Sequence, residues 1–291
     1  MASLLDMRRR IRSVKNTQQI TKAMKMVSAA KLKRAQDRVV ASRPYSHKMA
    51  EVLGDLSAKV AGEISHPLLD ERGDEKYLIV LISADKGLAG AFNANIIKAT
   101  LAFLNEHPGM STEMIPVGRK GRDFFKRRHI TFAEEYVGLT APGQVKHADA
   151  VEIAHKVIDL FTDDSSIDKV FIVFTEFKTV LSQKPVIEQL LPIPRRSQES
   201  ETQVGAEAEY IYEQPAAEIF AKLLPKQIET QIYSGMLESV ASEQGSRMTA
   251  MDSASKNAGE LIDTLTLNMN RIRQAAITKE IIEVVSGAAA A

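Results

Sequence analysis

The sequence predicts an α/β protein in which two long terminal helices flank a compact middle segment built around a sheet. All ten prolines lie between Pro44 and Pro225, apolar residues near the C-terminus repeat every 3.5 residues, and short apolar runs alternate with helical stretches in the middle. Proline breaks helix interiors, so its absence from both ends permits unusually long helices there. We expect the segment boundaries at 1–64, 65–214 and 215–291.

The N-terminal segment consists mostly of good helix formers from Ser3 to about Ile64. Its apolar stripe shifts position along the helix, a pattern typical of a helix whose partner contact rotates along its length. The stripe moves from Leu4, Met7, Ile11 and Val14 to Ile20, Met24 and Val27, and then to Leu32, Ala35 and Val39. Ser42-Arg43-Pro44 predicts a kink or break, after which the stripe resumes at Met49.

The C-terminal segment carries a cleaner pattern, because steps of four and three alternate over twelve positions. These positions are Leu237, Ala241, Gln244, Met248, Met251, Ser255, Ala258, Ile262, Leu265, Met269, Ile272 and Ala276. A 3.5-residue repeat of this length predicts a left-handed coiled coil. Gly235, Gly245 and Gly259 each cost about 1 kcal/mol relative to Ala in a helix, so we expect close backbone approach there.

The middle segment alternates between apolar runs typical of buried strands and helical stretches. The expected strands are Tyr77–Ile82, Met114–Val117, Val170–Phe174 and Val186–Leu191, and the expected helices are Asn93–Glu106, Lys120–Arg128 and Lys146–Phe161. Such alternation predicts a small, mostly parallel sheet. Residues 195–209 are polar and predict an exposed loop.

Charge is distributed unevenly along the chain, although the net charge is only +1. The first 48 residues hold 13 Lys and Arg against two acidic residues, a net of +11, and the other 243 residues hold 25 against 35, a net of −10. Such a basic arm suits a partner helix, a solvated face, a nucleic acid or an anionic membrane, although it has no aromatic residue before Tyr45 for base stacking. Its Arg-rich start imitates a transit peptide, but the helical pattern continues without a break, so we expect mature structure.

Several chemistries lack the residues that they require. The chain has no Cys, which excludes a disulfide framework, a thiolate nucleophile and a Cys-ligated metal. Neither usual phosphate-binding motif is present, and no His pattern has metal-ligand spacing, so we expect no catalytic residue, cofactor or metal. No apolar stretch approaches the length of about 18 residues that spans a bilayer.

Three motifs invite a functional interpretation. Ser83-Ala84-Asp85-Lys86-Gly87-Leu88-Ala89-Gly90 follows a strand and precedes a helix, as an anion-binding turn does, but a tight connection that needs two glycines is the favoured interpretation. Gly118-Arg119-Lys120-Gly121-Arg122 is interpreted as a solvated turn, and Asp163-Asp164 as a loop or helix end.

Both ends of the chain resemble the gamma subunit of F-type rotary ATP synthase. The N-terminal resemblance covers Ile11 to Met24, read as IRSVKNTQQITKAM, and the C-terminal resemblance covers Ala241-Ser242-Glu243-Gln244, Arg247-Met248 and the run from Arg273 to Glu283. Ala41-Ser42-Arg43-Pro44-Tyr45 and Ser83 to Gly90 also match. The similarity extends over essentially all 291 residues.

The resemblance implies an α/β fold in which the N- and C-terminal helices form a long antiparallel coiled coil beside a central Rossmann-like domain. It implies a rotor subunit, present once per complex, that couples ion flow through the c ring to ATP synthesis or hydrolysis at the beta subunits without catalysing a reaction itself. The implied partners are the alpha and beta subunits, the epsilon subunit and the c ring, with no nucleic acid. The implied location is peripheral, on the cytoplasmic face of a bacterial plasma membrane.

Motif positions carry the implied contacts onto individual residues of this chain. Met24 and Lys25 would face the acidic lever of the beta subunits. Arg273, Gln274 and Thr278 would engage one catalytic subunit at a time, with Arg247 and Glu283 in support, and Tyr210 and Tyr212 would approach the c ring. The alternatives are a basic coiled-coil protein that binds nucleic acid or an anionic membrane, and a nucleotide-binding enzyme that uses the Gly87–Gly90 turn.

Overall fold

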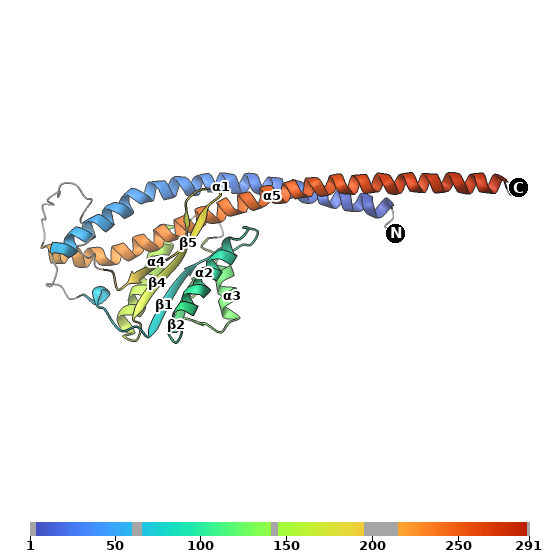
Figure 1. Ribbon diagram of the computed structural model, residues 1–291. Coiled ribbons are helices and arrows are strands. Elements are labelled where there is room, and N and C mark those ends of the chain that lie inside the picture. Colours follow the sequence, from blue (N-terminus) through green and yellow to red (C-terminus); the bar gives the residue numbers. More distant parts are fainter. Residues whose placement is uncertain (1–3, 60–65, 141–144, 195–214, 290–291) are drawn as a thin grey trace. The chain divides into compact units, whose positions relative to one another are not determined.

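The computed structural model describes residues 4–59, 66–140, 145–194 and 215–289, and Figure 1 shows the order of its elements. The chain divides into two compact units, one made of Met1–Ala29 and Arg247–Ala291 and the other of Ala30–Ser246. The elements in chain order are α1 (Leu4–Lys59), the short 3₁₀ helix η1 (Pro67–Leu69), β1 (Lys76–Ile82), α2 (Phe92–Glu106), β2 (Ser111–Val117), α3 (Arg119–Lys126), β3 (Thr131–Phe132), α4 (His147–Asp163), β4 (Lys169–Phe177), β5 (Gln183–Leu191) and α5 (Ala216–Ala289).

A five-stranded sheet in the order β3-β2-β1-β4-β5 forms the centre of the second unit. β1 pairs in parallel with β2 and β4, β2 pairs in parallel with β3, and only β5 is antiparallel to its neighbour. The four predicted strands and three predicted helices are confirmed, each within a few residues. The sequence did not predict β3, because a strand of two residues has no detectable periodicity.

Helices cover both faces of the sheet (Figure 1). On one face, Ile96 of α2 and Phe125 of α3 are fully buried in one cluster with Ile79, Leu81 and Val173 of the strands. On the other face α5 approaches closely, since a Cβ at Gly235 would lie 3.1 Å from Ile172 Cδ1. The continuous apolar runs in β1 and β4 are therefore explained by burial on both sides.

α1 continues through Pro44, so of the kink or break predicted at Ser42-Arg43-Pro44 the break is wrong. Proline removes one helical N–H and disfavours the preceding turn, but tertiary packing on both sides outweighs this local cost. Val39 and Met49 are both buried, and Arg43 is hydrogen bonded to Glu238 of α5. Pro225 likewise lies inside α5.

The register of the α1 stripe does not slip, contrary to the sequence-based prediction. Ile20 and Val27, which were expected to continue the stripe, are 59% and 57% exposed. The positions of α1 that are least exposed, which we call the seam, keep alternating steps of three and four through polar residues. They are Leu4, Met7, Ile11, Val14, Gln18, Thr21, Lys25 and Ser28 in the first unit, and Leu32, Ala35, Val39, Ser42, Ser46, Met49, Leu53 and Leu56 in the second. The prediction failed because it assumed that a coiled-coil seam must be apolar throughout.

Candidate functional site

The pairing of α1 with α5 in the first unit is antiparallel and is fixed by polar contacts. Thr21 Oγ1 lies 3.1 Å from Ser255 Oγ, and Gln18 Nε2 donates to the Ser255 carbonyl oxygen at 3.3 Å. Four residues further along α1, Lys25 contacts Asp252, which precedes Ser255 in α5. The polar residues at these seam positions therefore set the register that apolar packing alone leaves undetermined.

An ion triad occupies the seam beside the predicted interaction residues. Lys25 Nζ lies 2.5 Å from Asp252 Oδ1, and Lys256 Nζ lies 3.1 Å from Asp252 Oδ2. Hydrogen bonds from Lys25 and Lys256 lower the pKa of the Asp252 carboxyl group. Met24 is half-buried next to this triad, and the Lys25 side chain is 42% exposed. An acidic partner that approaches Lys25 would therefore compete with Asp252 for its ammonium group.

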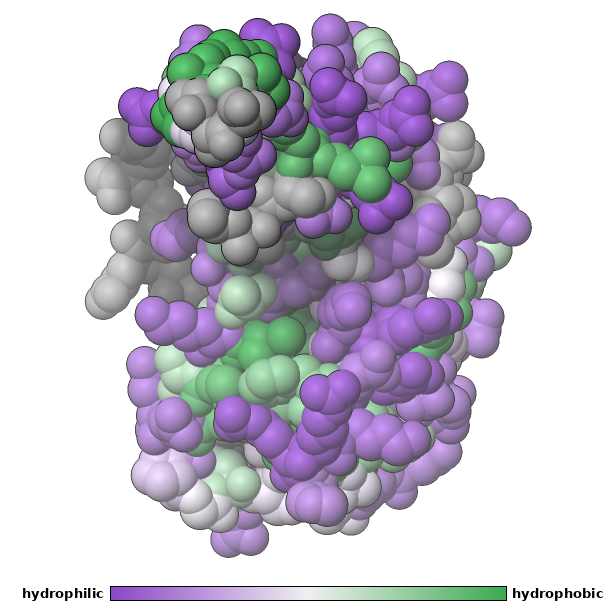
Figure 2. All heavy atoms as spheres, turned by 90° about the vertical axis from the view of Figure 1, so that its right-hand side faces the viewer, coloured by the Kyte–Doolittle hydropathy of each residue, from purple (hydrophilic) through white to green (hydrophobic). Residues whose placement is uncertain are grey.

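The C-terminal end of α5 extends past the end of its partner helix. Thr21 lies opposite Ser255, so Leu4, seventeen residues earlier in α1, is level with Ile272. All side chains from Ile277 to Ala288 are exposed, including Ile281 at 57% and Val284 at 72%. Figure 2 looks toward this end of the helix and shows green hydrophobic surface around its tip. Monomeric proteins rarely leave such residues grouped on one element, so this end is suited to a partner.

Arg273, Gln274 and Thr278 all lie exposed near this unpaired end. Thr278 Oγ1 donates to the Gln274 carbonyl oxygen at 2.9 Å, a contact that leaves the Gln274 side-chain amide available to a partner. Glu283 is also exposed and lies 3.5 Å from Lys279. In contrast, Arg247 is only 8% exposed. Tyr210 and Tyr212 lie outside the described residues.

The turn after β1 carries a carboxylate, Asp85, that accepts hydrogen bonds from backbone N–H groups in the way that an anionic ligand would. Backbone N–H groups of Arg119, Gly138 and Thr140 donate to Asp85 at 2.9–3.1 Å, and Thr140 Oγ1 donates at 2.8 Å. Burial opposes ionisation of Asp85, but the hydrogen bonds from Gly138, Thr140 and Arg119 outweigh it and lower its pKa. Within the motif itself, the Ala84 and Asp85 N–H groups donate to Asn93 Oδ1 and Thr140 Oγ1, which favours the structural interpretation of this motif.

The glycines of the two basic turns behave differently from the predictions. Gly90 has a positive φ of 53°, but Gly87 does not, and the non-glycine Leu88 adopts φ 61° instead. Gly118 is not part of a solvated turn, because a Cβ there would lie 2.1 Å from the Ser83 carbonyl oxygen. Gly121 N also donates to Ser83 Oγ at 2.9 Å, so this turn packs directly against the end of β1. The charged residues of this motif indicated a solvated turn, although Gly118 and Gly121 are buried.

Arg43, from the Ala41–Tyr45 motif, forms a partly buried contact that the sequence did not predict. Its guanidinium donates to Glu238 Oε1 at 2.9 Å, and the Glu238 carboxylate also accepts from the Phe177 backbone N–H at 2.9 Å. β1 pairs with β4 only as far as Val173. The backbone groups of β4 after Val173 therefore have no neighbouring strand on the β1 side. Ser239 and Ser242 of α5 bond to the backbone N–H and carbonyl of Thr175. Side chains of α5 therefore complete the hydrogen bonding at this strand end.

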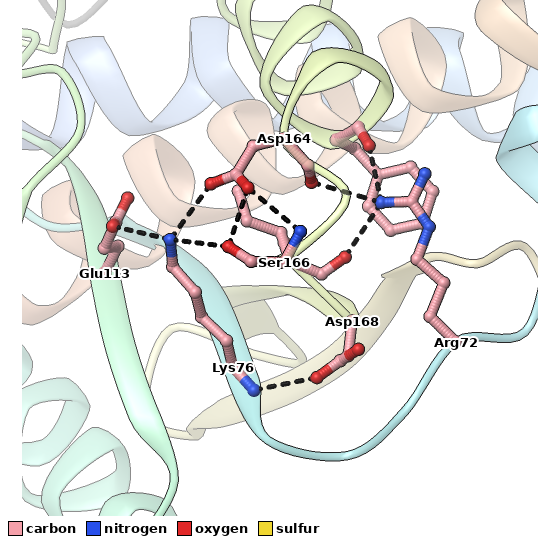
Figure 3. Close-up of polar contacts among 8 residues, drawn as sticks. Arg72, Lys76, Glu113, Asp164, Ser166 and Asp168 are labelled. Carbon is pink, nitrogen blue, oxygen red and sulfur yellow. Dashed lines mark hydrogen bonds and ion pairs between the residues drawn. The ribbon is translucent and has the colours of Figure 1, made fainter.

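A polar network closes the opposite end of the sheet (Figure 3). Lys76 Nζ lies 2.9 Å from Glu113 and 3.0 Å from Asp164, and Asp164 also accepts from the Ser166 backbone and hydroxyl groups. These hydrogen bonds from Ser166 and Lys76 lower the pKa of Asp164 to about 2. Arg72 donates to the Phe161, Asp164 and Ile167 carbonyl oxygens after α4. Asp164 is thus a helix-end residue, as predicted.

The described residues contain no cluster of His and acidic side chains that could hold a metal ion. None of the described helices is both long enough and apolar enough to cross a bilayer.

Comparison with known proteins gives consistent matches over the whole chain. A family model described as ATP synthase matches residues 3–291. An ATP synthase gamma chain from Solibacter usitatus is 53% identical over 294 residues, covering 100% of both chains, and one from Pelotomaculum thermopropionicum is 49% identical over 100% of this chain and 99% of the relative.

Solved structures give the same fold. The central stalk and c-ring structure of Tetrahymena thermophila mitochondrial ATP synthase contains a chain that is 26% identical, with a TM-score of 0.61, covering 81% of this chain and 99% of that one. The rotor of the Euglena gracilis mitochondrial enzyme contains a chain that is 19% identical, with a TM-score of 0.62, covering 94% of this chain and 98% of that one. This second likeness supports the fold alone.

Proposed function

Because this chain belongs to the ATP synthase gamma-chain family, we propose that its paired helices rotate inside a ring of alpha and beta subunits and drive their conformational changes. The chain is the gamma subunit of an F-type ATP synthase, a non-catalytic part of the central stalk. As such it belongs to the membrane-associated enzyme. The alternative, a basic coiled-coil protein that binds nucleic acid or an anionic membrane, gains no support from this membership.

One observation carries the proposed mechanism: α5 extends beyond its partner helix and exposes different side chains on each of its faces. An asymmetric shaft contacts three equivalent catalytic subunits in three different ways and stabilises a different conformation of each. Rotation then changes the nucleotide affinities of the three sites in sequence. Such coupling needs no catalytic group in the shaft.

The proposed contacts with the ring follow from the motif positions. Met24 and Lys25 face the lever of a beta subunit, and an acidic lever accounts for the net charge of +11 on the first 48 residues. Arg273, Gln274 and Thr278 engage one catalytic subunit at a time. Their exposure supports this role, because it leaves them accessible to a partner. Glu283 supports this region beside Lys279. Arg247 is buried and lies about 39 Å earlier along α5, so its supporting contact belongs to a different part of the shaft.

The exposed tail of α5 suits a bearing. From Val284 to Ala288 the tail has no charged or large polar side chain, so it offers few specific hydrogen bonds that would hold the shaft at one angle. We infer that the α/β part of the second unit contacts the epsilon subunit, and that Tyr210 and Tyr212, which lie outside the described residues, approach the c ring. The complex would then lie on the cytoplasmic face of a bacterial plasma membrane, with one copy of this chain.

Reconstitution with purified alpha and beta subunits tests the proposal. The full chain should yield an assembled complex that hydrolyses ATP, and failure to co-assemble would rule out the function. In the same assay, the triple variant R273A/Q274A/T278A should assemble but lose about ten-fold in ATP hydrolysis, as expected when charged and amide hydrogen bonds are removed. R271A is the matched control, because Arg271 is exposed on the same helix two residues earlier.

A further inference from the structure

A cavity of about 520 Å³ lies in the second unit, where α1, α5, the C-terminal half of β4 and Glu188 of β5 meet. We call it the β5 groove. Its polar lining includes Arg43, Glu176, Lys178, Glu188, Gln227 and Glu238. Its volume falls in the range of about 300–1,000 Å³ typical of ligand sites. The residues that are proposed to contact the catalytic ring belong to the first unit.

Four of the charged side chains in the groove neutralise one another in pairs. Arg43 Nη2 lies 2.9 Å from Glu238, and Lys178 Nζ lies 2.7 Å from Glu176. Glu188 is different, since no basic side chain among the described residues pairs with it. Among the described residues, the groove therefore keeps one carboxylate whose charge is not balanced by a basic side chain.

Glu188 lines the concave surface of the groove. Its side chain is exposed to water, although protein lies on either side of it. Partial burial and the nearby carboxylate of Glu176 raise the pKa of Glu188. Ionised Glu188 is thus destabilised in the free chain, and an approaching cation would relieve this cost.

A second acceptor in the groove is also unsatisfied. The Oε1 atom of Gln227 in α5 is buried and has no hydrogen-bond partner in the part of the chain that the structure describes. A buried acceptor without a donor costs about 1–3 kcal/mol. A water molecule that donates to Gln227 would not balance the charge of Glu188, whereas a cationic group supplies both a positive charge and hydrogen-bond donors.

We propose that the β5 groove receives the ammonium group of a lysine from a neighbouring subunit of the assembled stalk. An ammonium group has three separately directed donors, which suits single acceptors such as Glu188 and Gln227 better than the planar fork of a guanidinium does. Phe174 and Phe177 also line the groove and can pack against the apolar stem of the lysine. This proposal rests on the proposed function, because it requires the chain to work within a multisubunit complex.

Carbodiimide coupling in the assembled enzyme tests the contact directly. The reagent activates the Glu188 carboxyl group, the lysine amine displaces the resulting isourea as a urea, and an amide bond joins the two side chains. Mass spectrometry of the digested complex should identify a peptide pair that joins Glu188 to a lysine of another subunit. E188Q should abolish this product, and E176Q should retain it, because Glu176 is already paired with Lys178 of the same chain.

A second measurement separates a binding role from a structural one. E188Q removes a destabilised charge, so the free chain should keep or raise its Tm, while the affinity of the contacting subunit should fall about ten-fold. A structural role would lower both quantities. An assembled, ATP-hydrolysing complex that gives no cross-link from Glu188 to another subunit, or only one within this chain, would overturn the proposal and leave the proposed function intact. Failure of the unmodified chain to assemble would overturn both.

Discussion

Single carboxylates and arginines of the second unit hold together segments that are distant in the sequence. Asp85 connects the turn after β1 with the backbone of Arg119, Gly138 and Thr140. Glu238 joins α5 to Arg43 of α1 and to the end of β4. Because these charges are buried or partly buried, their hydrogen bonds decide whether they stabilise the fold or destabilise it.

Arg43 should contribute strongly to the stability of the free chain. R43A would leave Glu238, whose side chain is only 9% exposed, without its cationic partner, and removing one member of a buried pair costs about 3–5 kcal/mol. Since Arg43 is itself 44% exposed, we expect the lower end, about 3 kcal/mol, in urea-induced unfolding. The control R38A changes an exposed arginine five residues earlier in α1 and should cost less than about 0.5 kcal/mol. Equal losses in the two variants would contradict this account.

Asp164 should make stability depend on pH in the acid range. Its pKa in the folded chain is about 2, below the ordinary 3.8, so ionised Asp164 stabilises the fold above about pH 4, and this contribution is lost as the pH falls toward 2. D164N should therefore lower Tm at pH 7. The loss in the free energy of unfolding should stay under about 1 kcal/mol, because the side chain is 41% exposed and its charge is screened by solvent.

The Tm difference between the parent and D164N should shrink as the pH is lowered from 5. D163N is the matched control, because Asp163 is exposed and adjacent in sequence. A D164N difference that stays constant with pH would show that the carboxylate charge is not responsible.

At the scale of elements, the two halves of α5 place different demands on their glycines. A Cβ at Gly235 would meet Ile172 Cδ1 at 3.1 Å and the Phe174 ring at 3.4 Å, both inside the packed sheet face. A Cβ at Gly259 would meet only the Nε2 end of the flexible Gln18 side chain. Close packing therefore explains Gly235, whereas Gly259 is tolerant.

Alanine at these two positions should have opposite effects on stability. G235A should destabilise the chain by about 1–3 kcal/mol through overpacking, and G259A should be neutral or stabilise it by up to about 1 kcal/mol through helix propensity. Chemical denaturation of the two variants measures both changes. A destabilisation of similar size at Gly259 would mean that the helix pair in the first unit is packed as tightly as the sheet.

The sequence predicted the helices and strands well, but it did not predict the polar contacts that hold them together. Long apolar runs such as those in β1 and β4, and the 3.5-residue repeat of α5, identify strands and a coiled coil because burial alone selects them. The register of α1 depends instead on Gln18, Thr21 and Ser255, whose hydrogen bonds have no hydrophobic periodicity. Asp85 and Arg43 escaped detection because their partners lie far away in the sequence.

At the scale of the whole molecule, the uneven charge distribution agrees with the role of a shaft. The first unit contains 12 Lys and Arg against six acidic residues, a net of +6, and the second contains 26 against 31, a net of −5. Basic charge is thus concentrated on the helix pair that is proposed to turn against acidic levers. The absence of Cys also permits a single introduced Cys to serve as a specific attachment point.

Observation of rotation tests the central claim most directly. A complex of alpha and beta subunits with the K126C variant, labelled at this exposed position of α3 and fixed to a surface through the ring, would carry a visible probe. The account predicts that the probe turns continuously in one direction while ATP is hydrolysed and stops when ATP is exhausted. An assembled complex that hydrolyses ATP while the probe stays still would contradict it.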